Sequence, residues 1–257
     1  MMVWSPGDPG TDRQVRITER SRDALLQDIE RRVDTGDGFS LATLNLDHVV
    51  KLRRSREFRD AYLVQTHVTA DGRPIVWLSC LAGQRIDLLP GSELIDPVAA
   101  LAARKGIGVA LLGTTETALA RADDRLRRTH PGLEVELHLS PRMGFDPTGP
   151  DADAAIAAIA GSGAGLCFLA LGAPKQEVFS AYARSCLPNV GFLSVGAGLD
   201  FIAGTQRRAP PVVRMLAAEW IWRLAGNPQR LAARYGACLC ILPSLTLAAL
   251  RARSARS

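Results

Sequence analysis

Short apolar runs alternate with longer, mixed segments through the middle of the chain. The run Leu166–Leu171 contains only apolar residues, which is typical of a strand buried on both faces of a parallel sheet. The mixed segment Gln176–Cys186 that follows it is predicted to be a helix. Further strands are predicted at Phe39–Leu44, Tyr62–Thr66, Gly108–Leu112, Leu133–Leu137 and Gly191–Val195. Further helices are predicted at Ser21–Val33, Asp47–Arg54, Glu57–Ala61, Thr114–Thr129 and Asp151–Ile159.

This alternation predicts the fold class. Strands that alternate with helices of ten or more residues form parallel βαβ units. We therefore expect an α/β fold with a mostly parallel sheet and flanking helices. Ligands of such sheets bind outside the carboxyl ends of the strands. That rule points to four loops, Thr43–Asn45, Gly113–Glu116, Gly172–Glu177 and Gly196–Asp200.

The polarity of the chain changes after residue 206. Residues 207–257 contain nine arginines and one acidic residue, Glu219, whereas the whole chain has a net charge of +5. Tryptophan and arginine beside the apolar stretch Gly236–Leu250 are what a helix lying on a membrane surface needs. The stretch contains Pro243 and is too short to predict a membrane span. The alternative is a solvated basic helix whose tryptophans pack inward.

These features divide the chain into four parts. Residues 1–20 lack the apolar segment of a signal peptide and are expected to be a disordered leader. Residues 21–206 are expected to form the main α/β domain. Residues 207–250 are expected to be a basic, helical, membrane-associating appendage, and residues 251–257 a disordered tail.

Composition argues against several classes of protein. The five cysteines include no CxxC pair, which predicts a reducing compartment and neither a disulfide framework nor a zinc site. The modest net charge does not indicate a nucleic-acid-binding protein. Asp151-Ala152-Asp153 spells the DxD of metal-dependent glycosyltransferases, but it opens a predicted helix, where acidic residues favour the helix dipole. We expect it to cap that helix, and we expect neither a metal nor a cofactor.

Glycine begins three of the four loops, and in two of them the neighbouring residues suggest that the backbone approaches a ligand. Gly172–Glu177 opens a helix, so its free amide groups favour an anion, and Lys175 and Gln176 add charge and hydrogen bonds. The same residues also suit an ordinary strand-to-helix turn. Gly196–Asp200 contains half of a dinucleotide fingerprint, which leaves a nucleotide-binding oxidoreductase as an alternative, although Phe201 replaces the third glycine.

Asp71 follows the predicted strand Tyr62–Thr66 and precedes Gly72. An aspartate in such a turn is usually a local hydrogen-bond acceptor. Its functional interpretation is a general base that removes a proton from an acceptor hydroxyl. The residues alone leave both interpretations open.

Several of these segments occur in the same order in one known family. The chain resembles the WecG/TagA/CpsF glycosyltransferases of bacterial surface-polysaccharide and teichoic-acid assembly, from about Ser40 to Arg234. The resemblance rests on Thr43-Leu44-Asn45, Asp47-His48-Val49-Val50, Ala70-Asp71-Gly72, Gly172–Glu177, Gly196–Asp200, Ala203-Gly204, Arg208-Ala209-Pro210, Glu219-Trp220, Arg223-Leu224 and Pro228-Gln229-Arg230.

The resemblance implies a Rossmann-like domain that transfers a sugar with inversion and without a metal. It implies a UDP-sugar donor and a polyprenyl-diphosphate-linked acceptor. The catalytic aspartate of the family falls on Asp71, whereas Thr43 and Asn45 match polar residues near the acceptor and the donor sugar. The substrate-binding residues that it implies or that lie in the same loops are Gly113, Lys175, Gln176, Gly196, Asp200, Arg208, Arg223 and Arg230.

The resemblance also implies a location. The appendage brings the enzyme to the inner face of the plasma membrane as a peripheral protein, and its apolar surface would permit homo-oligomers. The alternatives are the nucleotide-binding oxidoreductase named above and an inert membrane adaptor with the same fold.

Three positions depart from the family pattern. Arg85 is offset from an arginine expected before Gly91, Arg234 lies one position late, and Arg73-Pro74 replaces small residues.

Overall fold

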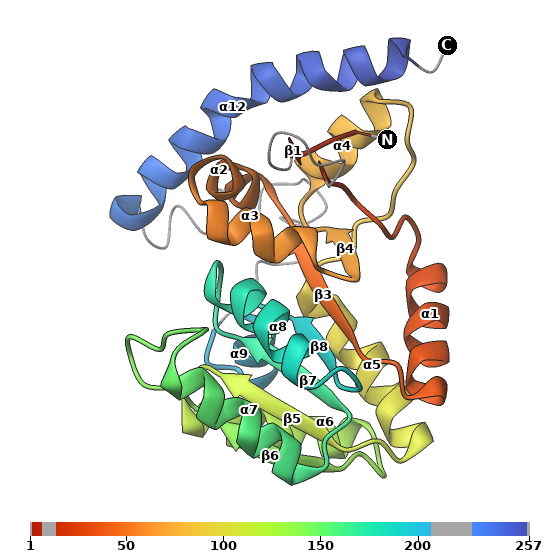
Figure 1. The fold of residues 1–257 in the computed structure, drawn as a ribbon, viewed down its shortest axis with the longest axis vertical. Helices are drawn as coiled ribbons and strands as arrows, with labels where there is room; N and C mark the ends of the chain where they lie inside the picture. Colours follow the sequence, from red (N-terminus) through yellow and green to blue (C-terminus); the bar gives the residue numbers. More distant parts are fainter. Residues whose placement is uncertain (1, 7–13, 207–227, 256–257) are drawn as a thin grey trace.

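The computed structural model describes residues 2–6, 14–206 and 228–255, and it confirms the α/β fold. At its centre is a six-stranded sheet in the order β4-β3-β8-β7-β5-β6, in which all neighbouring strands are parallel (Figure 1). A small antiparallel pair, β1 (Ser5–Pro6) and β2 (Gln14–Val15), precedes it. The sheet consists of β3 (Phe39–Leu44), β4 (His67–Ala70), β5 (Val109–Gly113), β6 (Val135–Leu139), β7 (Leu166–Ala170) and β8 (Gly191–Ser194).

Helices cover both faces of the sheet. Successive side chains of a strand point to opposite faces. Phe168 therefore packs in the cluster formed with α1, α5, α6 and α9, whereas its neighbours Cys167 and Leu169 pack with α7 and α8. The helices are α1 (Arg22–Thr35), α2 (Leu46–Arg54), α3 (Arg56–Leu63), α4 (Arg73–Leu81), α5 (Gly91–Lys105), α6 (Glu116–Thr129), α7 (Pro150–Ser162), α8 (Lys175–Cys186), α9 (Gly198–Ala203) and α12 (Pro228–Ser254).

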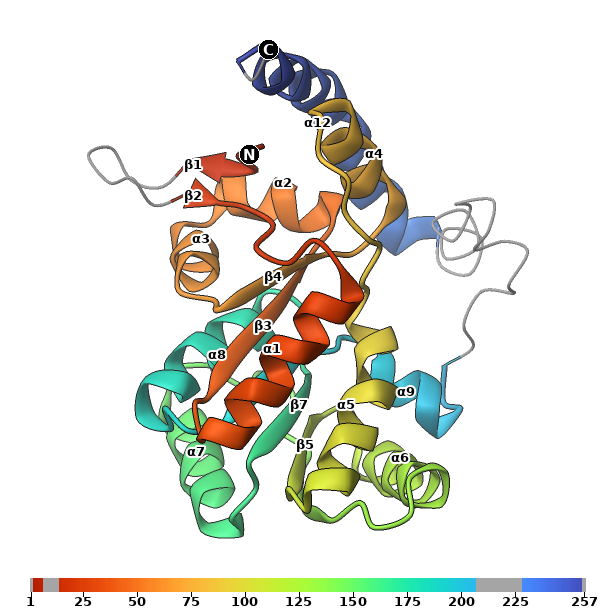
Figure 2. The same cartoon turned by 90° about the vertical axis from the view of Figure 1, so that its right-hand side faces the viewer.

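A third apolar cluster joins segments from both ends of the chain to one edge of the sheet. α12 lies across α2 and α4, and its Leu245 and Ala249 are buried there (Figures 1 and 2). Met2, Trp4, Val15 and Ile17 are buried in the same cluster. Residues 2–6 and 14–20 thus differ from the disordered leader that the sequence predicts, because their few apolar side chains have a surface to pack against.

α12 corrects two expectations about the tail. It continues to Ser254 through part of the predicted disordered segment 251–257, where alanine and arginine are good helix formers. Its segment Leu231–Ser254 is long and apolar enough, by length and composition alone, to cross a membrane, and most of it is not buried. Pro243 does not end this helix, so the apolar stretch is longer than the sequence suggests.

One predicted strand is wrong. Residues Tyr62 and Leu63 belong to α3, and the strand β4 begins only at His67. Phe58 and Tyr62 lie four residues apart on one helix face, with ring centroids 5.0 Å apart, and both are buried. Ser55 caps this helix by accepting a hydrogen bond from the Phe58 amide at 3.1 Å. Capping and packing therefore outweigh the strand preference of the sequence after Tyr62.

Candidate functional site

The carboxyl edge of the sheet brings Asn45 and Asp71 together. They follow β3 and β4, which are parallel neighbours with Leu44 paired to Ala70. Asn45 Nδ2 donates a hydrogen bond to Asp71 Oδ2 at 3.2 Å, and the Asp71 amide donates to the Leu44 carbonyl at 2.8 Å. Asn45 Oδ1 accepts from the His48 amide at 3.0 Å and caps α2. The capping bond orients the Asn45 amide, and the pairing of β3 with β4 places Asp71 beside it. Together they fix the orientation of the Asp71 carboxylate.

Thr43 lies near the same end of β3, where a buried network of polar side chains binds its carbonyl group. The Tyr62 hydroxyl donates to the Thr43 carbonyl at 2.7 Å, and it accepts from His48 Nδ1 at 2.7 Å. Complete burial, aided by the charge of Lys51, lowers the pKa of His48 to about 3. His48 is therefore neutral at physiological pH, with its proton on Nδ1. The sequence does not predict this role of Tyr62, because its pattern favours a strand at that residue.

The loops after β7 and β8 are joined by Gln176. Its Oε1 accepts from the Gly196 amide at 3.2 Å, and its Nε2 donates to Glu177 Oε1 at 2.8 Å. Gln176 and Glu177 are both buried. Burial raises the pKa of the Glu177 carboxyl to about 7. Lys175 begins α8 beside them and is partly exposed.

The loop after β5 is tied to α9 through Asp200. The Thr114 hydroxyl donates to Asp200 Oδ1 at 2.6 Å, and Thr205 donates to the same oxygen at 3.0 Å. Thr114 has a φ of 50°, a strained value for a β-branched residue of the kind that clusters at functional sites. Gly113 packs directly on β7, because a Cβ there would lie 2.4 Å from the Ala170 carbonyl. Asp200 thus connects the loop after β5 to α9, and it lies near the carboxyl edge of the sheet.

The remaining predicted residues lie elsewhere or outside the described residues. Arg208 and Arg223 lie outside them, and for Arg230 the structure describes only the helical backbone. Arg85 is exposed in the segment between α4 and α5. Asp151 and Asp153 lie in the first turn of α7, where they favour the helix dipole, but neither caps the helix as expected, because its N-cap is Gly149; Asp153 accepts a hydrogen bond from the Tyr182 hydroxyl instead. Within the described ranges, no group of three or more His, Cys, Asp or Glu side chains is arranged to hold a metal ion.

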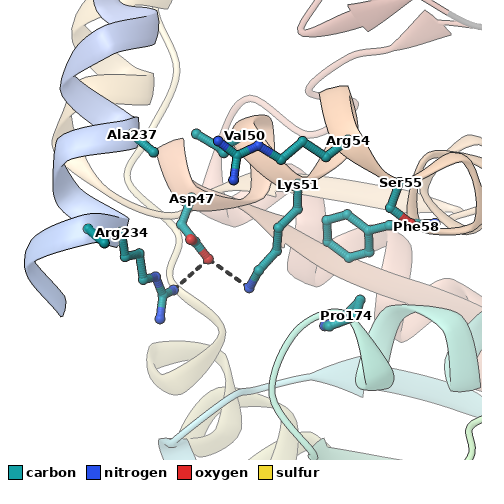
Figure 3. Close-up of a pocket in the computed structure, with 10 residues that line it drawn as sticks. Asp47, Val50, Lys51, Arg54, Ser55, Phe58, Pro174, Arg234 and Ala237 are labelled. Atoms are coloured by element: carbon teal, nitrogen blue, oxygen red, sulfur yellow. Dashed lines mark hydrogen bonds and ion pairs between the residues drawn. The ribbon is translucent and has the colours of Figure 1, made fainter. Parts of the chain in front are cut away.

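A cavity of about 370 Å³ lies beside this edge, between α2, α12 and the loop after β7 (Figure 3). In this cavity Asp47 Oδ2 forms ion pairs with Lys51 Nζ at 2.8 Å and with Arg234 Nη2 at 2.6 Å. Lys51 also donates to the Ala173 carbonyl at 3.1 Å. Burial opposes ionisation of Asp47, but the hydrogen bond from Lys51 and the charge of Arg234 outweigh it and lower the pKa.

The cavity combines a cationic end with an apolar wall. Arg54 also lines the cavity, so its lining contains three cationic side chains and one carboxylate. The apolar lining comes from Val50, Phe58, Pro174, Ala233 and Ala237. Such a cavity suits an anionic group attached to an apolar chain. Asp47 belongs to a segment that carries the family resemblance, but the sequence did not single out Lys51 or Arg54.

Comparison with known families agrees with this arrangement. The model of the Glycosyl transferase WecG/TagA/CpsF family matches residues 13–257, which is nearly the whole chain. Members of this family transfer sugars in the synthesis of cell-surface polysaccharides. The protein is accordingly a glycosyltransferase, and the chain belongs to the WecG/TagA/CpsF family.

Proposed function

We propose that this protein moves a sugar from a UDP-sugar to a polyprenyl-diphosphate-linked acceptor, with inversion and without a metal. The observation that carries the proposal is the pairing of Asp71 with Asn45 at the carboxyl edge of the sheet. The acceptor hydroxyl attacks the anomeric carbon from the face opposite UDP. The bond between the anomeric carbon and UDP breaks, and its electron pair leaves with the diphosphate oxygen of UDP. Asp71 takes the hydroxyl proton as general base.

The donor is expected to lie across the loops after β5, β7 and β8. Gly113, Gln176, Gly196 and Asp200 line or hold these loops. The departing diphosphate needs positive partners if no metal supplies them. The first turn of α8 offers the positive end of the helix dipole together with the charge of Lys175. Further cations are expected from Arg208, Arg223 and Arg230.

The acceptor is expected to approach from the side of α12. The cavity lined by Lys51, Arg54 and Arg234 suits a diphosphate and the first part of a prenyl chain. The exposed leucines of α12 and its arginines suit contact with an anionic membrane surface. The described cysteines are unpaired, in keeping with the reducing cytoplasmic side. Because α12 packs along α2 and α4, we expect it to lie on the inner face of the membrane rather than to cross it, with self-association through the same surface as a secondary expectation.

A panel of UDP-sugars with a lipid-diphosphate-linked acceptor tests this proposal. We expect transfer from at least one UDP-sugar, in the presence of EDTA, with inverted anomeric configuration in the product. Transfer that stops in EDTA and returns with Mn²⁺ or Mg²⁺ would contradict metal independence. Transfer only from a sugar carried by another nucleotide would contradict the donor assignment.

A further inference from the structure

Glu177 is a fully buried carboxyl group beneath the edge where the donor is proposed to bind. Its Oε1 accepts the hydrogen bond from Gln176 Nε2. Its Oε2 is buried without a hydrogen-bond partner among the residues that the structure describes. A carboxyl group that is only half satisfied and removed from water is costly. Stability therefore does not explain why a glutamate occupies this position.

Gln176 connects this carboxyl group to the glycine loop. The two ends of a glutamine amide differ, because Nε2 only donates and Oε1 only accepts hydrogen bonds. A carboxyl oxygen beside Nε2 fixes which way the amide faces. That orientation presents Oε1 to the Gly196 amide, which donates to it at 3.2 Å. Gly196 has a φ of 56°, so this bond holds the backbone where the chain turns sharply.

We propose that Glu177 is a positioning residue: it orients the Gln176 amide, and that amide holds the Gly196 backbone at the donor site. The inference rests on the proposed function for the identity of the ligand. The backbone of Glu177 is itself anchored, because Gln65 Nε2 donates to its carbonyl at 3.2 Å and to Ser180 Oγ at 3.0 Å. A rigid support for the Gln176 amide is what a preorganised site requires.

The charge of Glu177 is not needed for this role. Lys51 and Asp47 of α2 and Tyr62 of α3 are the ionisable groups that interact with it electrostatically. With its pKa raised to about 7, the carboxyl group is present in both forms near neutral pH. A proton on Oε2 leaves Oε1 free to accept from Gln176. A neutral side chain that keeps an acceptor oxygen should therefore replace it.

Two substitutions in the full chain test the proposal. Glu177→Gln keeps an acceptor for Gln176 Nε2, whereas Glu177→Met keeps the length and removes it. We expect Glu177→Met to unfold no more easily than the natural protein, because it removes a buried, half-satisfied carboxyl group. We nevertheless expect it to raise the Kd for UDP, measured by calorimetry, about ten-fold, and to accelerate hydrogen exchange of the Gly196 amide about ten-fold. Glu177→Gln should stay within about three-fold of the natural protein in both measurements.

A double substitution separates positioning from a general packing effect. If Glu177 acts through Gln176, adding Glu177→Met to Gln176→Ala should change the Kd for UDP and the exchange rate of the Gly196 amide by less than about two-fold. Gln84→Met is a matched control, because Gln84 is another buried side chain with an unpartnered Nε2 among the described residues. It should leave Gly196 exchange and UDP affinity unchanged.

Three results would overturn the inference. The first is normal Gly196 exchange in Glu177→Met, and the second is full additivity with Gln176→Ala. The third is a ten-fold defect in Glu177→Gln, which decides the question even if Glu177→Met does not fold. Failure of the natural protein to bind UDP would instead remove the donor assignment, and Gly196 exchange would still test Glu177.

Discussion

At the scale of single residues, the site depends on buried polar groups that hold the backbone of its loops in place. Tyr62 and His48 support the Thr43 backbone, while Glu177 and Gln176 support Gly196. The sequence pattern put Thr43 and Asn45 at the end of a strand, whereas Asp71 was identified through the family resemblance, because the strand before it was predicted too early in the chain. The sequence could not reveal the supporting bonds, since these join residues that are brought together only by helix packing.

Tyr62→Phe removes one hydroxyl from this support. The Thr43 carbonyl and His48 Nδ1 would each lose a buried partner, so we expect a loss of about 1–3 kcal/mol in the free energy of unfolding. Urea denaturation measures this loss. Tyr182→Phe is the control, because its exposed hydroxyl donates to Asp153 on the surface and its removal should matter much less. Equal effects of the two substitutions would refute a supporting role for Tyr62.

Glu177→Gln should change how stability depends on pH. The pKa of Glu177 is raised from 4.5 to about 7 on folding, so the unfolded chain releases this proton first as pH rises. The natural protein therefore loses stability between about pH 4.5 and 7, and the glutamine variant lacks this loss. We expect the variant to gain up to about 3 kcal/mol relative to the natural protein between pH 5 and pH 8. Urea denaturation at the two pH values would disprove this if the difference stayed constant.

At the scale of elements, the parallel βαβ pattern was predictable and the region after Asp71 was not. Five of the six sheet strands were predicted, four from short, mainly apolar runs and β6 from the alternating segment Leu133–Leu137. The prediction of the sixth strand, β4, was wrong because it began at Tyr62, where a helix cap and an aromatic pair outweigh the strand preference. No helix was predicted at α4 or α5, whose mixture of proline, glycine and apolar residues lacks a simple period.

Gly91→Ala tests how closely α5 approaches the site. A Cβ at this position would lie 2.4 Å from the Ser194 carbonyl and 3.3 Å from Thr43 Cγ2. Backbone cannot move away cheaply, so we expect a destabilisation of about 1–3 kcal/mol together with weaker activity. Gly161→Ala, near the end of α7 with nothing within 4 Å, should instead stabilise by about 0.5–1 kcal/mol. Thermal denaturation that ranks the two variants the other way would contradict the packing described here.

At the scale of the whole molecule, the C-terminal helix lines the cavity beside the sheet edge, and we propose that its exposed face contacts the membrane. Arg234 of α12 forms an ion pair with Asp47 of α2, and Arg53 donates to Ser244 at 3.2 Å. The charge of the tail was evident from the sequence. Its docking across α2 and α4 was not, because that requires the apolar cluster shared with Met2 and Trp4.

A chain ending at Gln206 should lose both membrane binding and most activity. It lacks α12, so the cavity loses one wall and the apolar cluster loses Leu245 and Ala249. Flotation with vesicles containing anionic lipid measures the first effect, and transfer to the lipid-linked acceptor measures the second. A soluble truncation with full activity would refute the role assigned to the tail.

The most direct test of the central claim is sugar transfer by Asp71→Asn. Asparagine preserves the shape of the side chain but cannot accept the proton of the acceptor hydroxyl. We predict that kcat falls by about 10²–10⁴-fold, while the far-ultraviolet circular dichroism and the Kd for UDP remain those of the natural protein. Near-normal turnover in this variant would show that Asp71 is not the base.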